Sequence, residues 1–322
     1  MRRYGASLEG DAAVFTVHSA HAERIELCLF AASGTEDRVD MAREADGAWV
    51  ARLPGLADGA RYGFRAHGKF DPQTGHCFDA SKLLADPMAS ALDGPWIFHP
   101  DFARHGADTA RLAPKSVLRA APPRAEVLGR AFPAGGLIYE IAVKAFSINN
   151  PAIAPTLRGT LAALAEPAAL DHVAKLRMDA VELMPLVAWI DERHLPPLGL
   201  SNAWGYNPVT LCALDPRIAP GGFDDLRGVC AAMHERGVAV FLDVVFNHTG
   251  ESDALGPVLC MRGLDDATWY RRSEGGYVND TGCGNTLACD HPVVIAHVIA
   301  ALRRFVEWAG VDGFRFDLGV TL

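Results

Sequence analysis

Short runs in which apolar and polar residues alternate fill the first part of the chain. Such runs occupy residues 14–17, 25–30, 49–53 and 62–65, and glycine, aspartate and serine separate them. Alternation with a period of two is typical of a strand that buries one face. Several short strands with turn residues between them favour a sandwich of two sheets. We therefore predict a small β-sandwich within residues 1–110.

After residue 136 the pattern changes to continuous apolar runs that alternate with amphipathic stretches. Apolar runs predict strands at 137–146, 180–186, 238–246 and 313–318, and the stretches between them predict helices at 157–176, 223–236 and 292–308. Strands that are apolar on both faces are typical of a parallel sheet, and right-handed crossovers would place them side by side. Pro292 suits the first turn of a helix. We predict an α/β unit at 137–322.

The two predicted units are separated by a stretch of about 25 residues with weak periodicity. Prolines and a Gly-Gly pair accumulate there, at Pro114, Pro122, Pro123, Pro133 and residues 135–136. Such a composition is typical of a connector between domains. The sequence therefore predicts a linker at residues 111–136.

Charged and polar residues stand near the ends of two of the apolar strands. Arg315 and Asp317 are two positions apart, so they share one face of the last strand. Asp243 and Asn247 share a face of the preceding strand, and His248 follows its end. A structural arginine–aspartate pair explains either group alone. Both groups at the carboxyl ends of neighbouring parallel strands indicate a functional site, because α/β folds place their sites there.

Charge and cysteine content exclude several classes of protein. The 30 basic and 39 acidic side chains give a net charge of −9 without a basic stripe, so we expect no nucleic-acid partner. Seven scattered cysteines without a CxxC pair favour reduced thiols and a cytoplasmic location. The N-terminus lacks the apolar run of a signal peptide, and acidic residues interrupt the longer apolar runs. We expect neither export nor a membrane span.

No motif for a cofactor or a metal emerges from the sequence. The segment Gly282-Cys283-Gly284 is too short for a dinucleotide fingerprint, and no GxxxxGK[ST] motif occurs. His291 and His297 fall on different faces of the predicted helix, and His18 and His21 belong to a β-rich segment that we expect at the surface. We therefore predict no cofactor and no metal site.

Several motifs resemble those of one enzyme family. Residues 243–249 (DVVFNHT) and 313–317 (GFRFD) resemble two signature segments of the α-amylase superfamily, glycoside hydrolase family 13. Within it, residues 191–195, 202–208 and 282–287 are similar to bacterial glycogen debranching enzymes of the isoamylase type. At the front, residues 61–65, 70–72 and 82–87 resemble the carbohydrate-binding module of family 48 that precedes the barrel in those enzymes.

The resemblance implies a fold, a reaction and a role for individual residues. The fold would be a β-sandwich followed by the first half, strands 1 to 4, of a (β/α)8 barrel. Asp317 would be the nucleophile of a retaining hydrolysis of α-1,6 branch links in glycogen or limit dextrin, and Arg315 would keep its carboxylate ionised. The remaining residues would bind the sugar or orient the network: Tyr206 under the ring, His248 at its hydroxyls, and Asp243 beside Arg315 and Asn247.

The chain departs from the family pattern in two ways. Ala142 and Ala145 stand where the family has histidine and glycine, and Asp290 stands where it has asparagine, which bears on substrate preference. A (β/α)8 barrel has eight strands in about 250 residues, whereas residues 137–322 supply only four predicted strands. The resemblance implies a general acid that follows the fifth strand. Glu307, Asp312 and Asp265 are not assigned to that role. We expect this chain alone to be poorly stable and inactive.

Two other functions are compatible with the same residues. One is a non-catalytic α-glucan-binding protein, and the other is an α-1,4-acting amylase or a transferase that shares the chemistry of Asp317. A continuation of the reading frame with a glutamate after a fifth strand would favour the enzyme. Comparing pullulan, limit dextrin and amylose as substrates would separate the two bond specificities. The sequence does not set the oligomeric state.

Overall fold

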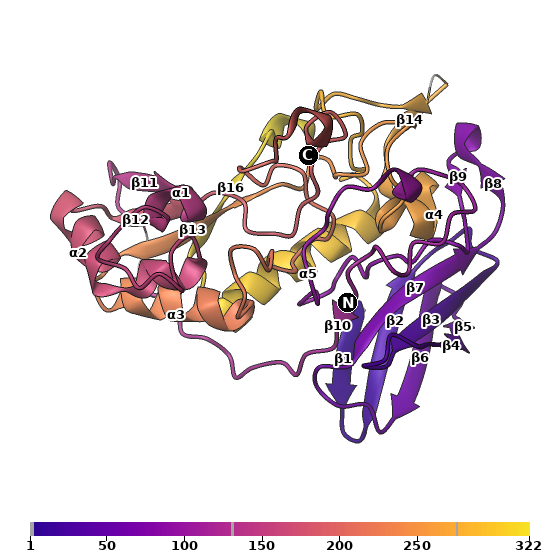
Figure 1. Cartoon of the computed structure of the whole chain (residues 1–322), viewed down its shortest axis with the longest axis horizontal. Helices are drawn as coiled ribbons and strands as arrows, with labels where there is room; N and C mark the ends of the chain where they lie inside the picture. The colour runs from indigo at the N-terminus through magenta and orange to yellow at the C-terminus, as the bar shows by residue number, and fades with distance from the viewer. Residues whose placement is uncertain (1–2, 130–131, 275) are drawn as a thin grey trace.

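Two units, each built around β-sheets, make up the molecule (Figure 1). The computed structural model describes residues 3–129, 132–274 and 276–322. In Figure 1 the sandwich lies at the right and a parallel sheet with its helices at the left, and helix α5 (Pro292–Ala309) runs from the side of the sandwich towards the sheet. None of the helices in these described ranges has the length and apolarity needed to cross a lipid bilayer.

The sandwich consists of two antiparallel four-stranded sheets. One has the order β1 (Gly5–Glu9), β2 (Ala12–His18), β6 (Ala48–Pro54), β5 (Ala42–Arg43), and the other β10 (Ser116–Val117), β7 (Arg61–His67), β3 (Arg24–Phe30), β4 (Glu36–Asp40). Side chains of the inward positions, among them Phe15, Ile25 and Phe64, are fully buried between the sheets. The alternating runs of the sequence thus correspond to β2, β3, β6 and β7.

Part of the predicted linker belongs to the sandwich. Ser116 and Val117 form β10, which pairs with Tyr62 and Arg61 of β7. Beyond β10 the chain crosses to the other unit below α5 in Figure 1, and the Ala125 N–H donates to the Glu307 carbonyl at the end of α5 (2.7 Å). The connector is therefore attached to both units.

The α/β unit contains a four-stranded parallel sheet. Its strands, in spatial and in chain order, are β11 (Ile138–Ile141), β12 (Ala180–Leu183), β13 (Ala239–Val244) and β16 (Gly313–Phe316). Helices α2 (Pro167–Leu176), α3 (Phe223–His234) and α5 connect successive strands, and α4 (Met261–Trp269) lies in the long connection after β13. As predicted, α5 begins at Pro292, and the His291 ring accepts the Val293 N–H (3.3 Å).

Short elements occupy the connections between these strands and helices. They are β8 (Phe70–Asp71), η1 (Pro72–Thr74), β9 (His76–Cys77), η2 (Pro100–Phe102), α1 (Val143–Ser147), η3 (Leu161–Ala165), η4 (Pro196–Leu198), β14 (Arg272–Ser273), β15 (Gly276–Tyr277) and η5 (Gly319–Thr321).

Three predicted strands end two or three residues early, at Leu183, Val244 and Phe316, and two predicted elements differ by more. The first strand was expected to reach residue 146, but it ends at Ile141 and residues 143–147 form α1. A short apolar run does not distinguish a buried strand from a buried helix. The helix expected at 157–176 begins only at Pro167, and η3 precedes it. Proline has no N–H and suits the first turn of a helix, so it starts the helix there.

The two units share an extensive interface. The Tyr4 ring stacks on the His297 ring of α5 with centroids 4.0 Å apart, and the Ser19 hydroxyl donates to the Leu264 carbonyl (2.7 Å). The Ala20 N–H donates to the carboxylate of Asp265 (2.7 Å). His18, expected at the surface, is buried in this region with 4% of its surface exposed. That expectation was wrong because a strand pattern does not show which face of a sheet another unit covers.

Candidate functional site

The carboxyl ends of β13 and β16 bring three predicted residues together. Asp243 pairs with Arg315 in the parallel register of the two strands. Arg315 Nη1 donates to both oxygens of Asp243 (3.0 and 2.9 Å) and to Oδ1 of Asp317 (3.0 Å). The predicted shared faces of the two strands therefore meet, and one guanidinium nitrogen bridges two carboxylates.

Asn247 connects the end of β13 to the chain that follows β16. Its side-chain amide donates to the backbone carbonyl and to Oδ2 of Asp317, both at 2.9 Å. The Asp317 N–H in turn donates to the Val244 carbonyl (3.0 Å). Asp317 is thus held through its backbone and both carboxylate oxygens, an arrangement that fixes the direction of its side chain.

Tyr206 reaches this group from the connection that follows β12. Its hydroxyl donates to Oδ2 of Asp243 (2.5 Å). Gly205 precedes it with φ +82°, and a Cβ there would lie 2.9 Å from the Pro185 carbonyl oxygen. Only glycine accepts both the left-handed backbone and this close approach. The turn at Gly205 therefore positions the phenol against the acid of β13.

His248 lies beside this group and contacts only protein oxygen atoms through its ring nitrogens in the part of the chain that the structure describes. Nε2 lies 2.9 Å from the Tyr206 carbonyl, and Nδ1 contacts the side-chain oxygen of Asn247. The residue is 2% exposed. The predicted contact of His248 with a sugar hydroxyl would require one of these two contacts to be released.

Burial and charge shift the protonation equilibria of the site in different directions. Burial raises the pKa of Asp243, while the Tyr206 hydroxyl and the Arg315 guanidinium oppose that shift. Burial lowers the pKa of Arg315, but the two carboxylates outweigh it and raise this pKa above its ordinary value. The pKa of His248 is lowered by burial. Arg315 is therefore cationic throughout the neutral range, and the buried imidazole favours its neutral form.

A cavity of about 420 Å³ extends from Tyr206 and Asn207. Its walls come from the two connections that follow β12 and β13 and from one segment of the N-terminal region. Its lining includes Phe98, His99, Ala103, Asp191, Glu192, Arg193, His194, Tyr206, Asn207, Gly250, Ser252, Asp253, Leu255, Gly256, Pro257, Asn279, Gly282, Cys283 and Gly284. A volume of this size falls in the range of about 300–1,000 Å³ that is usual for small-molecule sites.

Three carboxylates on adjacent strands could in principle ligate a cation. Oxygen atoms of Glu140, Glu182 and Asp243 lie within 4.8 Å of one another. Asp243 is already engaged by Tyr206 and Arg315. Burial and the two neighbouring acids raise the pKa of Glu182. The absence of a required metal stays a prediction.

Comparison with known proteins locates both units among characterised folds. Residues 3–89 match the family described as Carbohydrate-binding module 48 (Isoamylase N-terminal domain). The whole chain superimposes on pullulanase from Anoxybacillus sp. LM18-11 with a TM-score of 0.78 at 22% identity, covering 100% of this chain and 45% of that one.

Two further solved structures give similar figures. The pullulanase from Bacillus acidopullulyticus has a TM-score of 0.76 at 22% identity, with 99% and 38% of the two chains covered. Pullulanase type I from Bacillus subtilis str. 168, complexed with maltose, has 0.76 at 23%, with 99% and 43% covered. The present chain therefore spans less than half the length of these proteins. The predicted fold class is confirmed: a module-48 β-sandwich precedes a parallel α/β region that matches part of the pullulanase fold.

The cavity wall contributed by the N-terminal region was missed by the sequence analysis. Phe98, His99 and Ala103 belong to a stretch without regular periodicity, which carries no signal of a site. The motif around residues 191–195, in contrast, does mark a cavity-lining connection. Its resemblance to a family segment was the available signal.

Proposed function

We propose that this chain is part of an α-glucan debranching glycosidase of the α-amylase superfamily, of the isoamylase type, acting on α-1,6 branch links of glycogen or limit dextrin. The observation that carries the proposal is the bridge of Arg315 Nη1 between Asp243 and Asp317 at the ends of two adjacent parallel strands. The module-48 match and the maltose and maltotetraose complexes of pullulanases of similar fold support an α-glucan as the ligand. The seven free thiols support a cytoplasmic location.

In the proposed reaction Asp317 acts as the nucleophile. One carboxylate oxygen attacks the anomeric carbon while the bond from that carbon to the bridging oxygen breaks, and a general acid protonates the leaving oxygen. Water then hydrolyses the glycosyl-enzyme, so the configuration is retained. Arg315 donates to the carboxylate of Asp317, Asn247 fixes the orientation of that carboxylate, and Asp243 holds Arg315 and the Tyr206 hydroxyl. The Tyr206 ring would stack against the sugar.

The general acid has no assigned residue in this chain. A retaining enzyme needs a second carboxyl group about 5–5.5 Å from the nucleophile. Asp312 instead accepts from the Leu128 and Val240 N–H groups and contacts His234 (2.8 Å). Asp265 is likewise committed to the interface between the units. We propose that the 322-residue polypeptide alone does not hydrolyse glucans at a measurable rate.

An activated substrate tests the nucleophile without the general acid. Fluoride leaves from α-maltosyl fluoride without protonation, so attack by Asp317 forms the carbon–oxygen bond as the carbon–fluorine bond breaks. We expect slow fluoride release by the 322-residue chain, measured with a fluoride electrode, and at least tenfold slower release by Asp317→Asn. Equal rates for the two proteins would refute the assignment of Asp317.

The module-48 match favours one second candidate, a non-catalytic α-glucan-binding protein. It predicts glycogen binding without any fluoride release that depends on Asp317. The bond specificity is tested by calorimetry with a branched and a linear malto-oligosaccharide of equal glucose number. Tighter binding of the branched ligand supports debranching, and tighter binding of the linear one supports the α-1,4-acting alternative.

A further inference from the structure

A segment of the N-terminal region forms one wall of the cavity beside Tyr206. Phe98, His99 and Ala103 line it, opposite the connections that follow β12 and β13. These three residues lie outside the matched stretch 3–89, so the module-48 match does not account for them. His99 keeps 43% of its side chain exposed, whereas the adjacent η2 is anchored by the buried Phe102. The wall thus has a fixed base and an accessible rim.

The base of this wall is fixed by a buried lysine. Lys82 is 1% exposed, and its ammonium group donates to the carbonyls of Asp101 and Arg104 (2.6 Å each) and of Ala107 (3.0 Å). From the other side, the Val258 N–H donates to the Phe102 carbonyl (3.0 Å), which ties the segment to the α/β unit. All three ammonium protons have acceptors, so the buried charge orders the backbone around η2.

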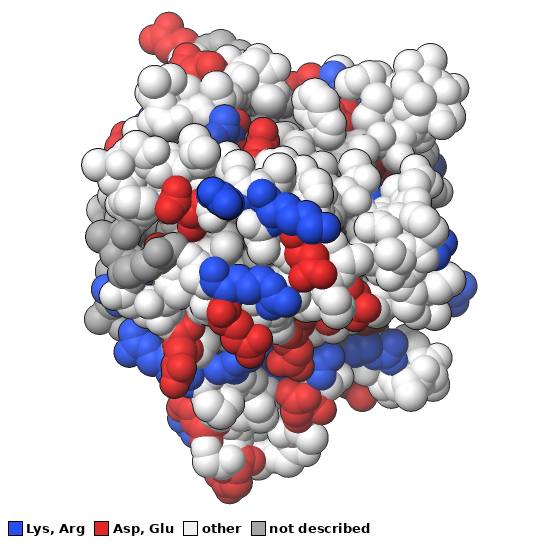
Figure 2. Space-filling model, turned by 90° about the vertical axis from the view of Figure 1, so that its left-hand side faces the viewer, with Lys and Arg blue, Asp and Glu red and all other residues white. Residues whose placement is uncertain are grey.

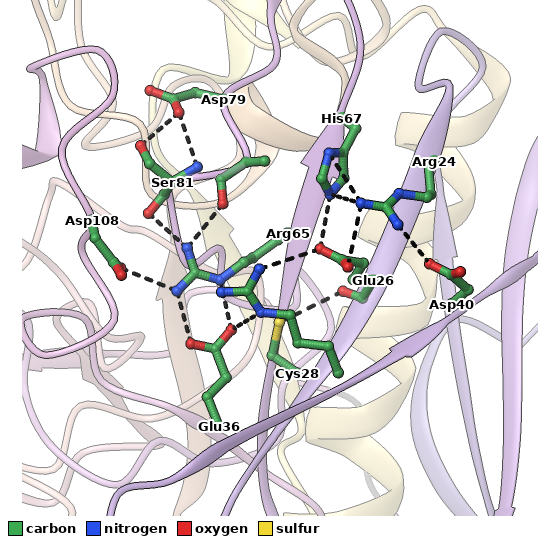
Figure 3. A network of polar contacts seen from close by, with 12 residues as sticks. Arg24, Glu26, Cys28, Glu36, Asp40, Arg65, His67, Asp79, Ser81 and Asp108 are labelled. Carbon is green, nitrogen blue, oxygen red and sulfur yellow. Dashed lines mark hydrogen bonds and ion pairs between the residues drawn. The ribbon is translucent and has the colours of Figure 1, made fainter.

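A second network fixes both ends of the stretch that carries the wall (Figure 3). Arg65 of β7 donates to the carbonyls of Ala80 (2.9 Å) and Ser81 (2.8 Å) at one end, and to the carboxylate of Asp108 (3.1 Å) at the other. Asp79 joins the two ends as well, since it accepts from the Ser81 hydroxyl and from the Gly106 N–H (2.8 Å). The sandwich therefore anchors both ends of the segment that forms this wall of the cavity.

The cavity suits a neutral polyhydroxylated ligand. Arg193 and Asp253 also line it and form a two-bond ion pair (2.6 Å each), so their charges are mutually compensated. Asp191 and Glu192 accept from the backbone and side-chain N–H groups of Asn202. An aromatic ring and an imidazole across from these groups offer a stacking face and a hydrogen-bonding group, which together match a pyranose ring.

We propose that Phe98 and His99 contact the glucan chain as it extends from the site at Tyr206, so that the N-terminal region is a structural wall of the substrate cleft. This inference rests on the proposed function, because it takes the ligand of the cleft to be an α-glucan. It assigns Phe98 as a stacking surface and His99 as a hydrogen-bonding partner. Both are specificity-determining contacts away from the reacting atoms.

Calorimetry of the 322-residue chain with maltohexaose tests the proposal. The test variant Phe98→Leu/His99→Ala removes the ring and the imidazole but keeps an apolar side chain at position 98. We expect its affinity to fall at least tenfold. Ile97→Ala is the matched control, because Ile97 is 69% exposed in the same segment and does not line the cavity. We expect the control to stay within twofold of the wild type.

A second measurement needs no variant. Diethylpyrocarbonate modifies accessible imidazoles, and mass spectrometry reports the modification of His99 with and without maltohexaose. Protection of His99 supports the proposal; unchanged modification at saturating ligand, or an affinity of the double variant within twofold of the wild type, overturns it. If the chain binds no maltohexaose yet releases fluoride through Asp317, the proposed contact of Phe98 and His99 with glucan is wrong while the proposed function stands. If neither occurs, both fail.

Discussion

Arg65 and Arg315 each bridge two carboxylates, yet they occupy opposite surroundings. Arg65 in the sandwich contacts Glu36 and Asp108 with 1% of its side chain exposed. Arg315 contacts Asp243 and Asp317 with 44% exposed. All three nitrogens of the Arg65 guanidinium donate to protein oxygens, whereas the three bonds of Arg315 pass through Nη1 alone. The same pairing of residue types is thus structural in one unit and accessible in the other.

The sheets that carry the two arginines differ in the same sense. The two sheets of the sandwich bury each other's inward faces. At the end of the parallel sheet, in contrast, Phe316 of β16 is 40% exposed and Val320 after it is 94% exposed. On the outer surface, acidic and basic side chains intermingle over the face in Figure 2, and no broad basic patch occurs there. Accessibility at strand ends, more than the arginine–aspartate pair itself, distinguishes the candidate site.

Removing each arginine gives the largest expected contrast. Arg65→Met removes a buried cation that donates to Glu36, to Asp108 and to two carbonyls, and Arg38 then still donates to Glu36. Breaking a buried pair in this way costs up to about 3–5 kcal/mol. Arg315→Met should cost less than Arg65→Met, because Arg315 is itself 44% exposed and the buried Asp243 keeps the Tyr206 hydroxyl as a donor. It should nevertheless abolish fluoride release that depends on Asp317. Urea unfolding and the fluoride electrode measure the two effects.

Arg24→Met is the control for the loss of a charged side chain from the same sheet. Arg24 is 47% exposed and pairs with Glu26 and Asp40 at 3.4 Å, so we expect a change below about 1 kcal/mol. A similar loss of stability for Arg65→Met and Arg24→Met would contradict the structural role assigned to Arg65. An Arg315→Met protein as destabilised as Arg65→Met would remove the contrast between the two units.

Acid should weaken the interface that joins the two regions. Burial lowers the pKa of His297 to about 4 against an ordinary value of 6.5; the Val293 carbonyl raises it, and His18 lowers it further. The unfolded chain therefore binds the proton of this imidazole more tightly than the folded chain does. The folded state keeps its full stability above pH 6.5 and loses stability as the pH falls towards 4. A shift of this size corresponds to at most about 3 kcal/mol.

The measurement is the free energy of unfolding between pH 7 and pH 4 for the wild type and His297→Gln. The variant loses the stacking on Tyr4, so its stability at pH 7 is lower, but its dependence on pH should be flatter across this window. Burial also lowers the pKa of His18, which adds a slope of the same sign to both proteins. A slope for His297→Gln that is as steep as that of the wild type would contradict the prediction.

The sequence predicts those features that depend on local periodicity. The alternation in β2, β3, β6 and β7 identifies the sandwich, and the two-residue spacing of Arg315 and Asp317 predicts their common face. Features that arise from contacts between distant segments are not predictable in this way. The burial of His18 and the cavity wall at Phe98 both depend on how the two units dock. The motif at residues 202–208 marks Tyr206, but no pattern shows that His248 lies between two protein oxygens.

The smallest effect on stability is expected at Trp204, which extends the accessible side of the comparison. Trp204 is 69% exposed, and the Asn202 side chain accepts the N–H groups of Trp204 and Gly205 (2.9 Å each), so the ring is displayed on an ordered loop. It lies two residues from Tyr206, a span of at most about 7 Å, so the glucan proposed to bind at Tyr206 would pass close to it. Trp204→Ala should change the free energy of unfolding by less than about 0.5 kcal/mol, as exposed substitutions usually do.

The same substitution should weaken maltohexaose binding several-fold, because a sugar ring loses an aromatic face of large area. Leu198→Ala is the control, since Leu198 is 68% exposed in the same connection but offers no ring. In the wild type, maltohexaose should also shield Trp204 from acrylamide quenching; among the other tryptophans, Trp49, Trp96, Trp189 and Trp269 are at most 5% exposed and contribute little to that signal. Equal affinities for the two variants, together with unchanged quenching, would show that an accessible side chain near Tyr206 does not by itself contact a glucan. Accessibility, the criterion drawn from Arg65 and Arg315, would then identify a site only for charged groups.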